Sequence, residues 1–207
     1  GAAWSQPHRE KVFSEQAGLL SNCLGTLRLT GLREYARMAE EIIGYLDGKL
    51  FDTRCGAFFG CEDFLRHEAG GNSSTDEFFT IIDKCVYSDA NAQAAGAYLE
   101  AAALLDRADC KERALNILEF IWNHCRSPAE GIFHYYDDSP RLPGLLDDHA
   151  QVGTALVQAY LASADAKHLE RARETAEFII ARLKNSAGVY FDLVAGEFGL
   201  RKFRLTD

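Results

Sequence analysis

The feature that most constrains the fold is a unit that occurs three times along the 207 residues. Each unit opens on a short polar segment ending in a glutamine, at Gln16, Gln93 and Gln151. An apolar stretch rich in small residues follows, then a charged amphipathic stretch, then a glycine ahead of aromatic residues, at positions 56, 131 and 188. The glutamine and the glycine are thus 40, 38 and 37 residues apart. Such a near-constant period indicates repeated supersecondary units.

Hydrophobic periodicity predicts that each unit is a hairpin of two helices. The first helix is apolar around most of its circumference, whereas the second has one apolar stripe, so the first is expected inside and the second outside. Pro7 suits the first turn of a helix, and the first helix is predicted to run from there to about Leu29. We therefore predict one all-α domain over residues 1–207, with αα-hairpins at about 8–50, 89–126 and 147–184.

An insertion separates the first two units over residues 64–87. Its centre is the run Gly70-Gly71-Asn72-Ser73-Ser74, whose residues favour loops over regular structure. We predict a long irregular excursion there, with short helical turns near residues 75–79 as its only regular part.

Polar and aromatic residues cluster where one hairpin leads into the next. In an αα-hairpin the chain runs along the inner helix and returns along the outer one, so every outer-to-inner connection lies at the N-terminal end of the inner helices. The glycine–aromatic loops and the starts of the inner helices are therefore predicted to share one rim. The candidate site residues on this rim are Phe59, Glu62, Asp63, Asp89, Asn91, His134, Tyr135, Asp148 and His149.

This combination of residue types suits a sugar. Aromatic rings stack on the apolar face of a pyranose, while carboxylates and amides hold its hydroxyl groups. Two carboxylates can also act as acid and base when their surroundings separate their pKa values. We assign catalysis to Asp89, Asp148 and His149. Substrate-binding roles are assigned to Phe59, Glu62, Asp63, Asn91, His134 and Tyr135.

Each of these residues has a structural alternative. Ser88, Asp89 and Asp147 stand where helix N-caps occur. His149 is as well suited to a satisfied position in the core as to acid–base catalysis. The aromatic residues two positions after each glycine are predicted to fill the core at the rim; they are Phe58, Phe133 and Tyr190.

Charge and composition restrict the partners. A net charge of −9 argues against nucleic acid or an anionic membrane surface, because both require a basic face. No apolar run reaches the roughly 18 residues of a membrane span, and no signal peptide precedes Trp4. The six cysteines include no Cys-x-x-Cys pair, which indicates reduced thiols and a cytoplasmic location.

We predict neither a cofactor nor a metal site. One alternative is a metal held within a single loop by Cys55, Cys61 and His67, but the spacing of these residues matches no standard zinc site.

Three segments together resemble a known family. Residues Phe58 to Asp63, Val86 to Ala92 and Leu145 to Ala150 are similar to motifs close to GGFYxSxDAD, YTDWNALM and LDDYA. These motifs occur in the helical-toroid portion of proteins that carry an N-terminal thioredoxin-like domain, including spermatogenesis-associated protein. The resemblance covers about residues 15–183. It implies an (α/α)6 toroid related to the six-hairpin glycosidases and N-acylglucosamine 2-epimerase, with the rim as its cleft.

The chain departs from that family at two rim positions. The family's tryptophan before Asn91 is Ala90, and its tyrosine after the aspartate pair is His149. The thioredoxin-like part is absent from this chain, and without a Cys-x-x-Cys pair no redox activity is expected here.

Three hairpins are visible, against the six of a closed ring. An open half-ring exposes apolar flanks, so we predict self-association or a missing portion of a longer parent chain. The leading hypothesis is a carbohydrate-active domain, either epimerase-like, with His134 facing His149, or hydrolase-like, with Asp89 and Asp148. The alternative is a non-catalytic helical domain that binds a sugar or serves as a scaffold for another protein.

Overall fold

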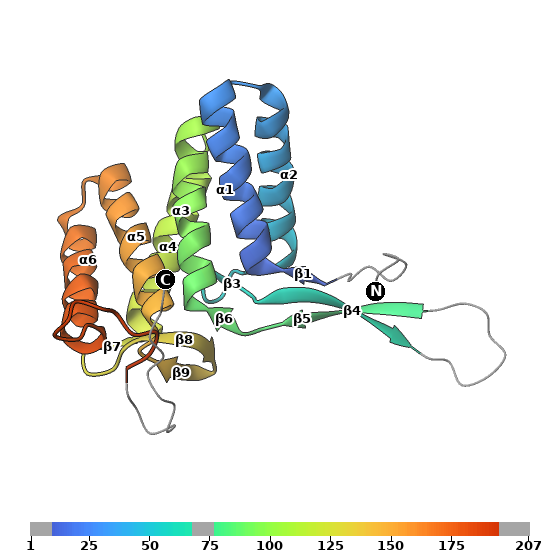
Figure 1. Ribbon diagram of the computed structural model, residues 1–207. Helices are drawn as coiled ribbons and strands as arrows, with labels where there is room; N and C mark the ends of the chain where they lie inside the picture. Colours follow the sequence, from blue (N-terminus) through green and yellow to red (C-terminus); the bar gives the residue numbers. More distant parts are fainter. Residues whose placement is uncertain (1–9, 68–76, 195–207) are drawn as a thin grey trace.

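A computed structural model of the chain describes residues 10–67 and 77–194 (Figure 1). Three helical hairpins stand side by side, which confirms the predicted all-α scaffold. They are α1 Phe13–Thr30 with α2 Arg33–Lys49, α3 Ser88–Leu104 with α4 Ala108–His124, and α5 Leu146–Ser163 with α6 Ala166–Phe178. A short π-helical turn, η1 Ile179–Leu183, continues α6.

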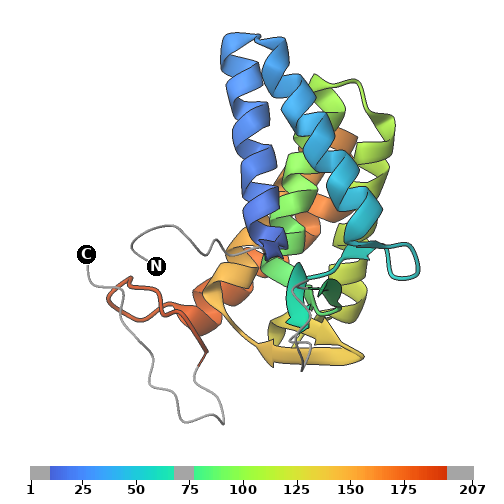
Figure 2. The same ribbon diagram turned by 90° about the vertical axis from the view of Figure 1, so that its right-hand side faces the viewer.

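The first helix of each hairpin lies inside, as predicted. The middle helix α3 packs against α1 on one side and α5 on the other, with α4 behind it (Figures 1 and 2). Accordingly α3 buries eleven of its residues, whereas the outer helices α2 and α6 bury three each. The near-continuous run of alanines in α3 permits this close approach from several sides, because a small side chain keeps the helix axes near one another.

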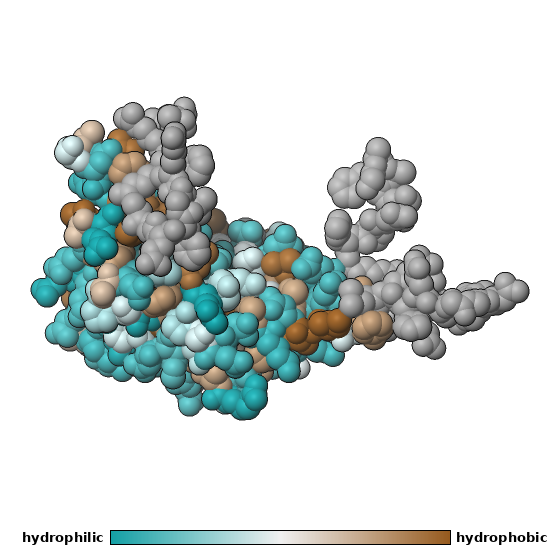
Figure 3. Space-filling view, turned by 90° about the horizontal axis from the view of Figure 1, so that it is seen from below, coloured by the Kyte–Doolittle hydropathy of each residue, from teal (hydrophilic) through white to brown (hydrophobic). Residues whose placement is uncertain are grey.

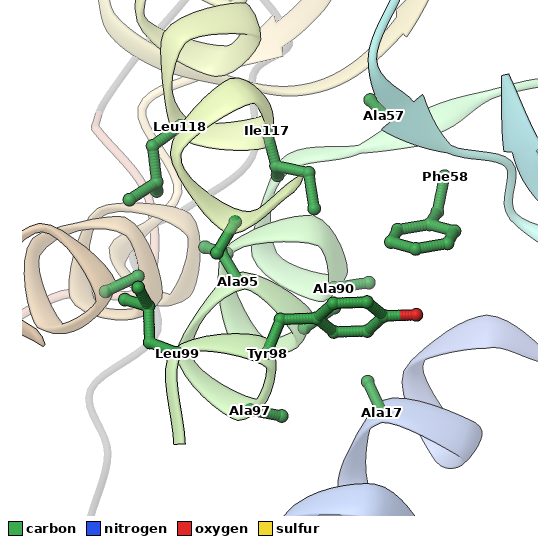
Figure 4. Close-up of a cluster of buried hydrophobic side chains, with 14 of the residues drawn as sticks. Ala17, Ala57, Phe58, Ala90, Ala95, Ala97, Tyr98, Leu99, Ile117 and Leu118 are labelled. Carbon is green, nitrogen blue, oxygen red and sulfur yellow. The ribbon is translucent and has the colours of Figure 1, made fainter. Parts of the chain in front are cut away.

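Phe58 and Tyr98 occupy the centre of the core (Figure 4). Their ring centroids lie 5.5 Å apart, and the Tyr98 hydroxyl donates a 2.8 Å hydrogen bond to Asp47 on α2. The core role predicted for Phe58 is confirmed, since its side chain is fully buried, and Phe133 is buried as well. The same prediction is wrong for Tyr190, which is 37% exposed.

The rim consists of short antiparallel strands that the helical pattern did not predict. After α2, β2 Phe51–Asp52 pairs with β3 Ala57–Phe58. Four more strands lie around the second junction: β6 Val86–Tyr87, β7 Arg126–Ser127, β8 Gly131–Asp137 and β9 Ser139–Pro143. Strand β8 pairs with β7 near its start, with β6 at Tyr135 and Tyr136, and with β9 along its length. The strands hold the rim loops against the N-terminal ends of the inner helices.

The predicted irregular insertion is wrong at both of its ends. Strands β4 Cys61–His67 and β5 Glu77–Asp83 form an antiparallel pair, and β1 Lys11–Val12 adds a third strand beside β4. The run Phe78 to Ile82 has the aromatic and β-branched composition of a strand, which the neighbouring glycines obscured. Helical turns are absent from residues 77–79, and residues 68–76 lie outside the described part of the chain.

The first helix also begins later than predicted. Helix α1 starts at Phe13, because Lys11 and Val12 pair with Glu62 and Cys61 in the sheet. Pro7, on which the earlier start depended, lies outside the described residues.

Leucines in the last turns of two inner helices are exposed. Leu29 on α1 is 85% exposed, and Leu161 on α5 is 76% exposed. Seen from the rim side, hydrophobic atoms also show near the arm formed by β4 and β5 (Figure 3), where Phe79 and Ile81 are 47% and 43% exposed. Self-association through these surfaces stays a prediction. Among the described helices, none combines the length and the apolar character of a membrane span.

Candidate functional site

Three polar side chains from three different elements meet on the rim. Asp89 lies in the first turn of α3, Asp148 in the first turn of α5, and His134 in the middle of β8. One possible ligand atom from each of the three lies within 4.8 Å of the others. His134 Nδ1 is 3.0 Å from Asp148 Oδ1. We call this group the rim centre.

Within the rim centre, two carboxylate oxygens are buried without a hydrogen-bond partner among the described residues. They are Oδ1 of Asp89 and Oδ2 of Asp148. Asp148 is fully buried, whereas the His134 side chain is 27% exposed and opens the group to solvent on one side. A buried acceptor without a donor is costly, and such groups are rare in folded proteins. The rim centre is therefore suited to a ligand that supplies the missing donors or positive charge.

The electrostatics of the His134–Asp148 pair favour one proton held between the two side chains. Burial raises the pKa of the Asp148 carboxyl above its ordinary value and outweighs the opposing hydrogen bond with His134. The hydrogen bond with Asp148 raises the pKa of His134 against the effect of burial, and the charge of Asp89 adds to both shifts. Which atom carries the proton depends on the histidine tautomer.

His149, to which we assigned catalysis, has a structural role instead. Its Nδ1 is 2.6 Å from the Leu145 carbonyl, and its Nε2 accepts a 3.0 Å hydrogen bond from the backbone N–H of Ile132. The ring stacks on Phe178 and is buried, and burial lowers its pKa. Gly131 has φ of 81°, and a Cβ there would collide with the His149 and Phe178 rings. With both ring nitrogens bonded to backbone, His149 has no nitrogen left for a substrate.

Asn91 is likewise structural, which contradicts its assignment to substrate binding. Its side chain is fully buried and makes three hydrogen bonds to backbone. The amide oxygen accepts from the N–H of Phe58 at 2.8 Å, and the amide nitrogen donates to the carbonyls of Phe58 and Tyr87 at 3.0 and 2.9 Å. Asn91 therefore clamps β3 and β6 to the start of α3.

The predicted N-caps are also wrong by one or two positions. Tyr87 and Leu145 occupy the N-cap positions of α3 and α5, and neither helix has a side-chain cap hydrogen bond. Ser88 instead donates a 2.6 Å hydrogen bond to the Phe133 carbonyl across the rim. Asp89 and Asp147 lie inside the first turn, where a negative charge complements the helix dipole.

The predicted acidic pair on β4 lies apart from the rim centre. Glu62 is 4% exposed and receives hydrogen bonds from Lys11 at 3.0 Å and from Tyr45 at 2.9 Å. Although burial alone would raise the pKa of Glu62, these two donors hold it below its ordinary value. Asp63 accepts a 2.7 Å hydrogen bond from the backbone N–H of Phe64. Glu62 thus fastens β4 to the first hairpin, and neither residue belongs to the rim centre.

The aromatic candidates divide between two places. Tyr135 lies beside the rim centre, with its ring 6.2 Å from that of His134. Phe59 instead lines a separate hollow of about 400 Å³, together with Phe120 and Tyr136. Sequence reasoning missed Tyr87, whose ring meets the His134 ring edge-on at 5.6 Å. The signal that could have identified Tyr87 is its place in the segment Val86 to Ala92, directly before Ser88 and Asp89.

No protein-family model and no curated protein matches the chain. Solved structures do match it. The chain has the fold of an (α/α) toroid. The cellobiose 2-epimerase of Spirochaeta thermophila aligns over 92% of this chain and 49% of its own, with a TM-score of 0.73 and 13% identity. A family 76 α-mannanase of Bacteroides thetaiotaomicron aligns over 97% and 50%, with a TM-score of 0.73 and 14% identity.

A third match is an α-1,6-mannanase of Salegentibacter, solved as an inactive variant with α-1,6-mannotriose. Two consecutive aspartates are replaced by asparagine in that variant. It aligns over 90% of this chain and 52% of its own, with a TM-score of 0.63 and 15% identity. The chain therefore spans about half the length of the toroids it matches. The matches confirm the toroid fold expected from the resemblance, while membership of the six-hairpin superfamily and of the thioredoxin-domain family stays a prediction.

Proposed function

We propose that the chain is part of a carbohydrate-acting toroid and that a sugar binds at the rim centre. One observation carries the proposal: the carboxylates of Asp148 and Asp89 meet at the rim centre, and each keeps a buried oxygen without a partner among the described residues. Sugar hydroxyl groups are donors of the kind these oxygens lack. The partly exposed His134 and the ring of Tyr135 border the same place, where a pyranose ring has an edge to bond and a face to stack on.

The matching toroids support the substrate class. They include a cellobiose 2-epimerase and two mannanases, all of them proteins that act on sugars. The inactive mannanase variant has lost two consecutive aspartates, and this chain carries the consecutive pair Asp147 and Asp148 at the start of α5. Because sequence identity is low, the neighbours support only the class of ligand. The type of reaction has to be argued from the geometry of the rim.

That geometry favours hydrolase-like over epimerase-like chemistry. The epimerase hypothesis needs His134 and His149 to face a substrate together, but both nitrogens of His149 are bonded to backbone. The hydrolase hypothesis needs two carboxylates at one place. One oxygen of Asp89 and one of Asp148 lie no more than 4.8 Å apart, so the two carboxylates share one place, as the paired carboxyl groups of glycosidases do.

The test is binding and turnover of a defined sugar. We expect α-1,6-mannotriose, or a related oligosaccharide from a small panel, to bind the chain in isothermal titration calorimetry or by NMR. Asp148→Asn and Asp89→Asn should weaken binding or abolish turnover, while Asp137→Asn, an exposed carboxylate on the same strand as His134, should leave both unchanged. If the two rim variants retain full sugar binding and turnover, the assignment fails.

A non-catalytic binding domain is the second candidate. One observation favours it: the polar atoms of Asn91, His149 and Glu62 form hydrogen bonds within the protein and therefore stabilise the fold. Sugar binding without release of reducing ends by the chain would support this candidate over hydrolysis. Absence of binding to every sugar in the panel would overturn the proposal as a whole.

A further inference from the structure

We propose that the rim centre binds a divalent transition-metal cation of the Zn²⁺ or Mn²⁺ type. The ligands are one carboxylate oxygen of Asp89, one of Asp148 and a ring nitrogen of His134. Cation binding follows from the side chains themselves. The role of the cation toward a sugar rests on the function proposed above, whose site it shares.

The first observation is convergence. The three ligand atoms come from α3, β8 and α5, and all lie within 4.8 Å of one another. Metal–ligand bonds of about 2.1 Å allow two donors to stand up to about 4.2 Å apart across the ion. An upper limit of 4.8 Å is slightly wider than that span, so the three ligands would move closer together on binding one ion.

The second observation is independent of the first and concerns unsatisfied charge. Asp148 is fully buried, and its Oδ2 has no partner among the described residues. Asp89 Oδ1 is also buried and has no partner within the described part of the chain, and the two carboxylates meet in the same group. Two carboxylates that share a site repel each other unless a proton or a cation lies between them. A divalent cation would satisfy both free oxygens and compensate both charges.

The donor set selects the class of cation. Calcium and magnesium prefer sites built from oxygen alone, whereas an imidazole nitrogen beside carboxylates suits zinc, manganese and similar ions. Three protein ligands leave further coordination positions open, as in catalytic rather than structural metal sites. Adjacent hydroxyl groups of a sugar fit such open positions.

The surroundings hold the histidine in place. The Tyr87 ring packs edge-on against His134, and the Tyr87 hydroxyl donates a 3.2 Å hydrogen bond to Asp83. This packing restricts the orientation of the His134 ring. By contrast, the Cys55–Cys61–His67 alternative gains no support: among the described side chains neither cysteine joins a group of metal ligands, and the His67 side chain is outside that set.

The experiment measures metal binding without any sugar. The whole 207-residue chain, free of a histidine tag and stripped with EDTA, is titrated with Zn²⁺, Mn²⁺ and Ca²⁺ by calorimetry, and bound metal is counted by mass spectrometry after dialysis. We expect about one Zn²⁺ or Mn²⁺ per chain, weaker binding of Ca²⁺, and a rise in Tm with the bound ion.

Variants locate the site. Asp148→Asn, Asp89→Asn and His134→Gln should each weaken binding at least tenfold, while the exposed His124→Gln and Asp137→Asn should bind like the parent chain. Circular dichroism verifies that every variant folds. Metal binding that survives in the Asp89→Asn/Asp148→Asn double variant, or a parent chain that takes up no stoichiometric metal, overturns the proposal.

The two proposals fail separately. Sugar binding is measured both with EDTA and with the preferred cation, and metal binding is measured without sugar. Stoichiometric metal in a chain that binds no sugar sustains the cation site and removes the sugar function. If the chain takes up no metal and binds sugar equally well with EDTA and with the cation, the sugar function is sustained and the cation site is removed.

Discussion

The starts of the second and third inner helices occupy equivalent places in the repeat, but their residues do not all have the same role. Their fourth positions, Asn91 in α3 and His149 in α5, have the same structural role with different chemistry. Asn91 ties the inner helix to the rim at Phe58, and His149 ties it to the rim at Ile132. In both hairpins a buried polar side chain satisfies backbone groups that the short rim strands leave unpaired.

The third positions differ. Ala90 in α3 is 5% exposed and packs into the core, whereas Asp148 in α5 is fully buried, contacts His134 and keeps an oxygen without a partner among the described residues. The second hairpin thus places a small apolar side chain where the third places a carboxylate. The comparison teaches that the fourth positions maintain the fold in both hairpins although their side chains differ, while the third position of α5, an aspartate where α3 has alanine, belongs to the candidate site.

The largest expected effect is on the second-hairpin junction. Asn91→Ala removes three hydrogen bonds, including those to the buried N–H and C=O groups of Phe58. We expect a loss of about 2–4 kcal/mol in the free energy of unfolding, measured by urea denaturation. Asn123→Ala, at an exposed position of α4, is the control and should change it by less than about 0.5 kcal/mol. Equal stability of the two variants would refute the clamp.

The third-hairpin junction should respond in the same direction and somewhat less. His149→Ala removes the hydrogen bond to Ile132 and the stacking on Phe178, with an expected cost of about 2 kcal/mol. His149→Asn, which imports the side chain used at Asn91, should recover part of that loss if the two positions are equivalent. Urea denaturation of His149→Ala and His149→Asn measures this recovery. Identical unfolding curves for the two variants would show that positions 91 and 149 are not equivalent.

A smaller effect is expected where a buried carboxylate is satisfied. Glu62 has donors in Lys11 and Tyr45, so Glu62→Gln should cost about 1 kcal/mol at neutral pH, a value kept low because Lys11 is partly exposed. Since the pKa of Glu62 is lower in the folded chain than its ordinary value of 4.5, its contribution is present above that pH and is lost as the pH falls below it. Thermal melts from pH 7 to pH 3 should show parent and variant converging in acid. A constant difference at all pH values would contradict the charge assignment.

The smallest effect on stability is expected at the unsatisfied carboxylate. Asp148→Ala makes the start of α5 resemble that of α3 and removes a buried oxygen without a partner, so the free energy of unfolding should change by less than about 1 kcal/mol in either direction. Sugar and cation binding should be lost. A destabilisation above about 2 kcal/mol in the same denaturation assay would instead make Asp148 a structural residue.

Part of this molecule follows from its sequence. The 3.6-residue period of apolar residues is a local property, and it was enough to predict three hairpins, their inner and outer helices and the shared rim. Chain reversal in each hairpin then placed Asp89, His134 and Asp148 at the same end of the scaffold, and the structure brings them together.

Pairing between distant segments was decided only by the tertiary structure. Strand β4 is recognised through its partners β1 and β5, the second of which begins beyond a glycine-rich stretch. The same holds within the rim, where Asn91, His149 and Asp148 look alike as buried polar residues near a helix start. Asn91 finds its partner 33 residues away and His149 finds one 17 residues away, while Asp148 keeps an oxygen with no partner in the described part of the chain. Whether a polar atom is satisfied depends on what the fold places within about 3 Å of it, and local sequence carries no record of that distance.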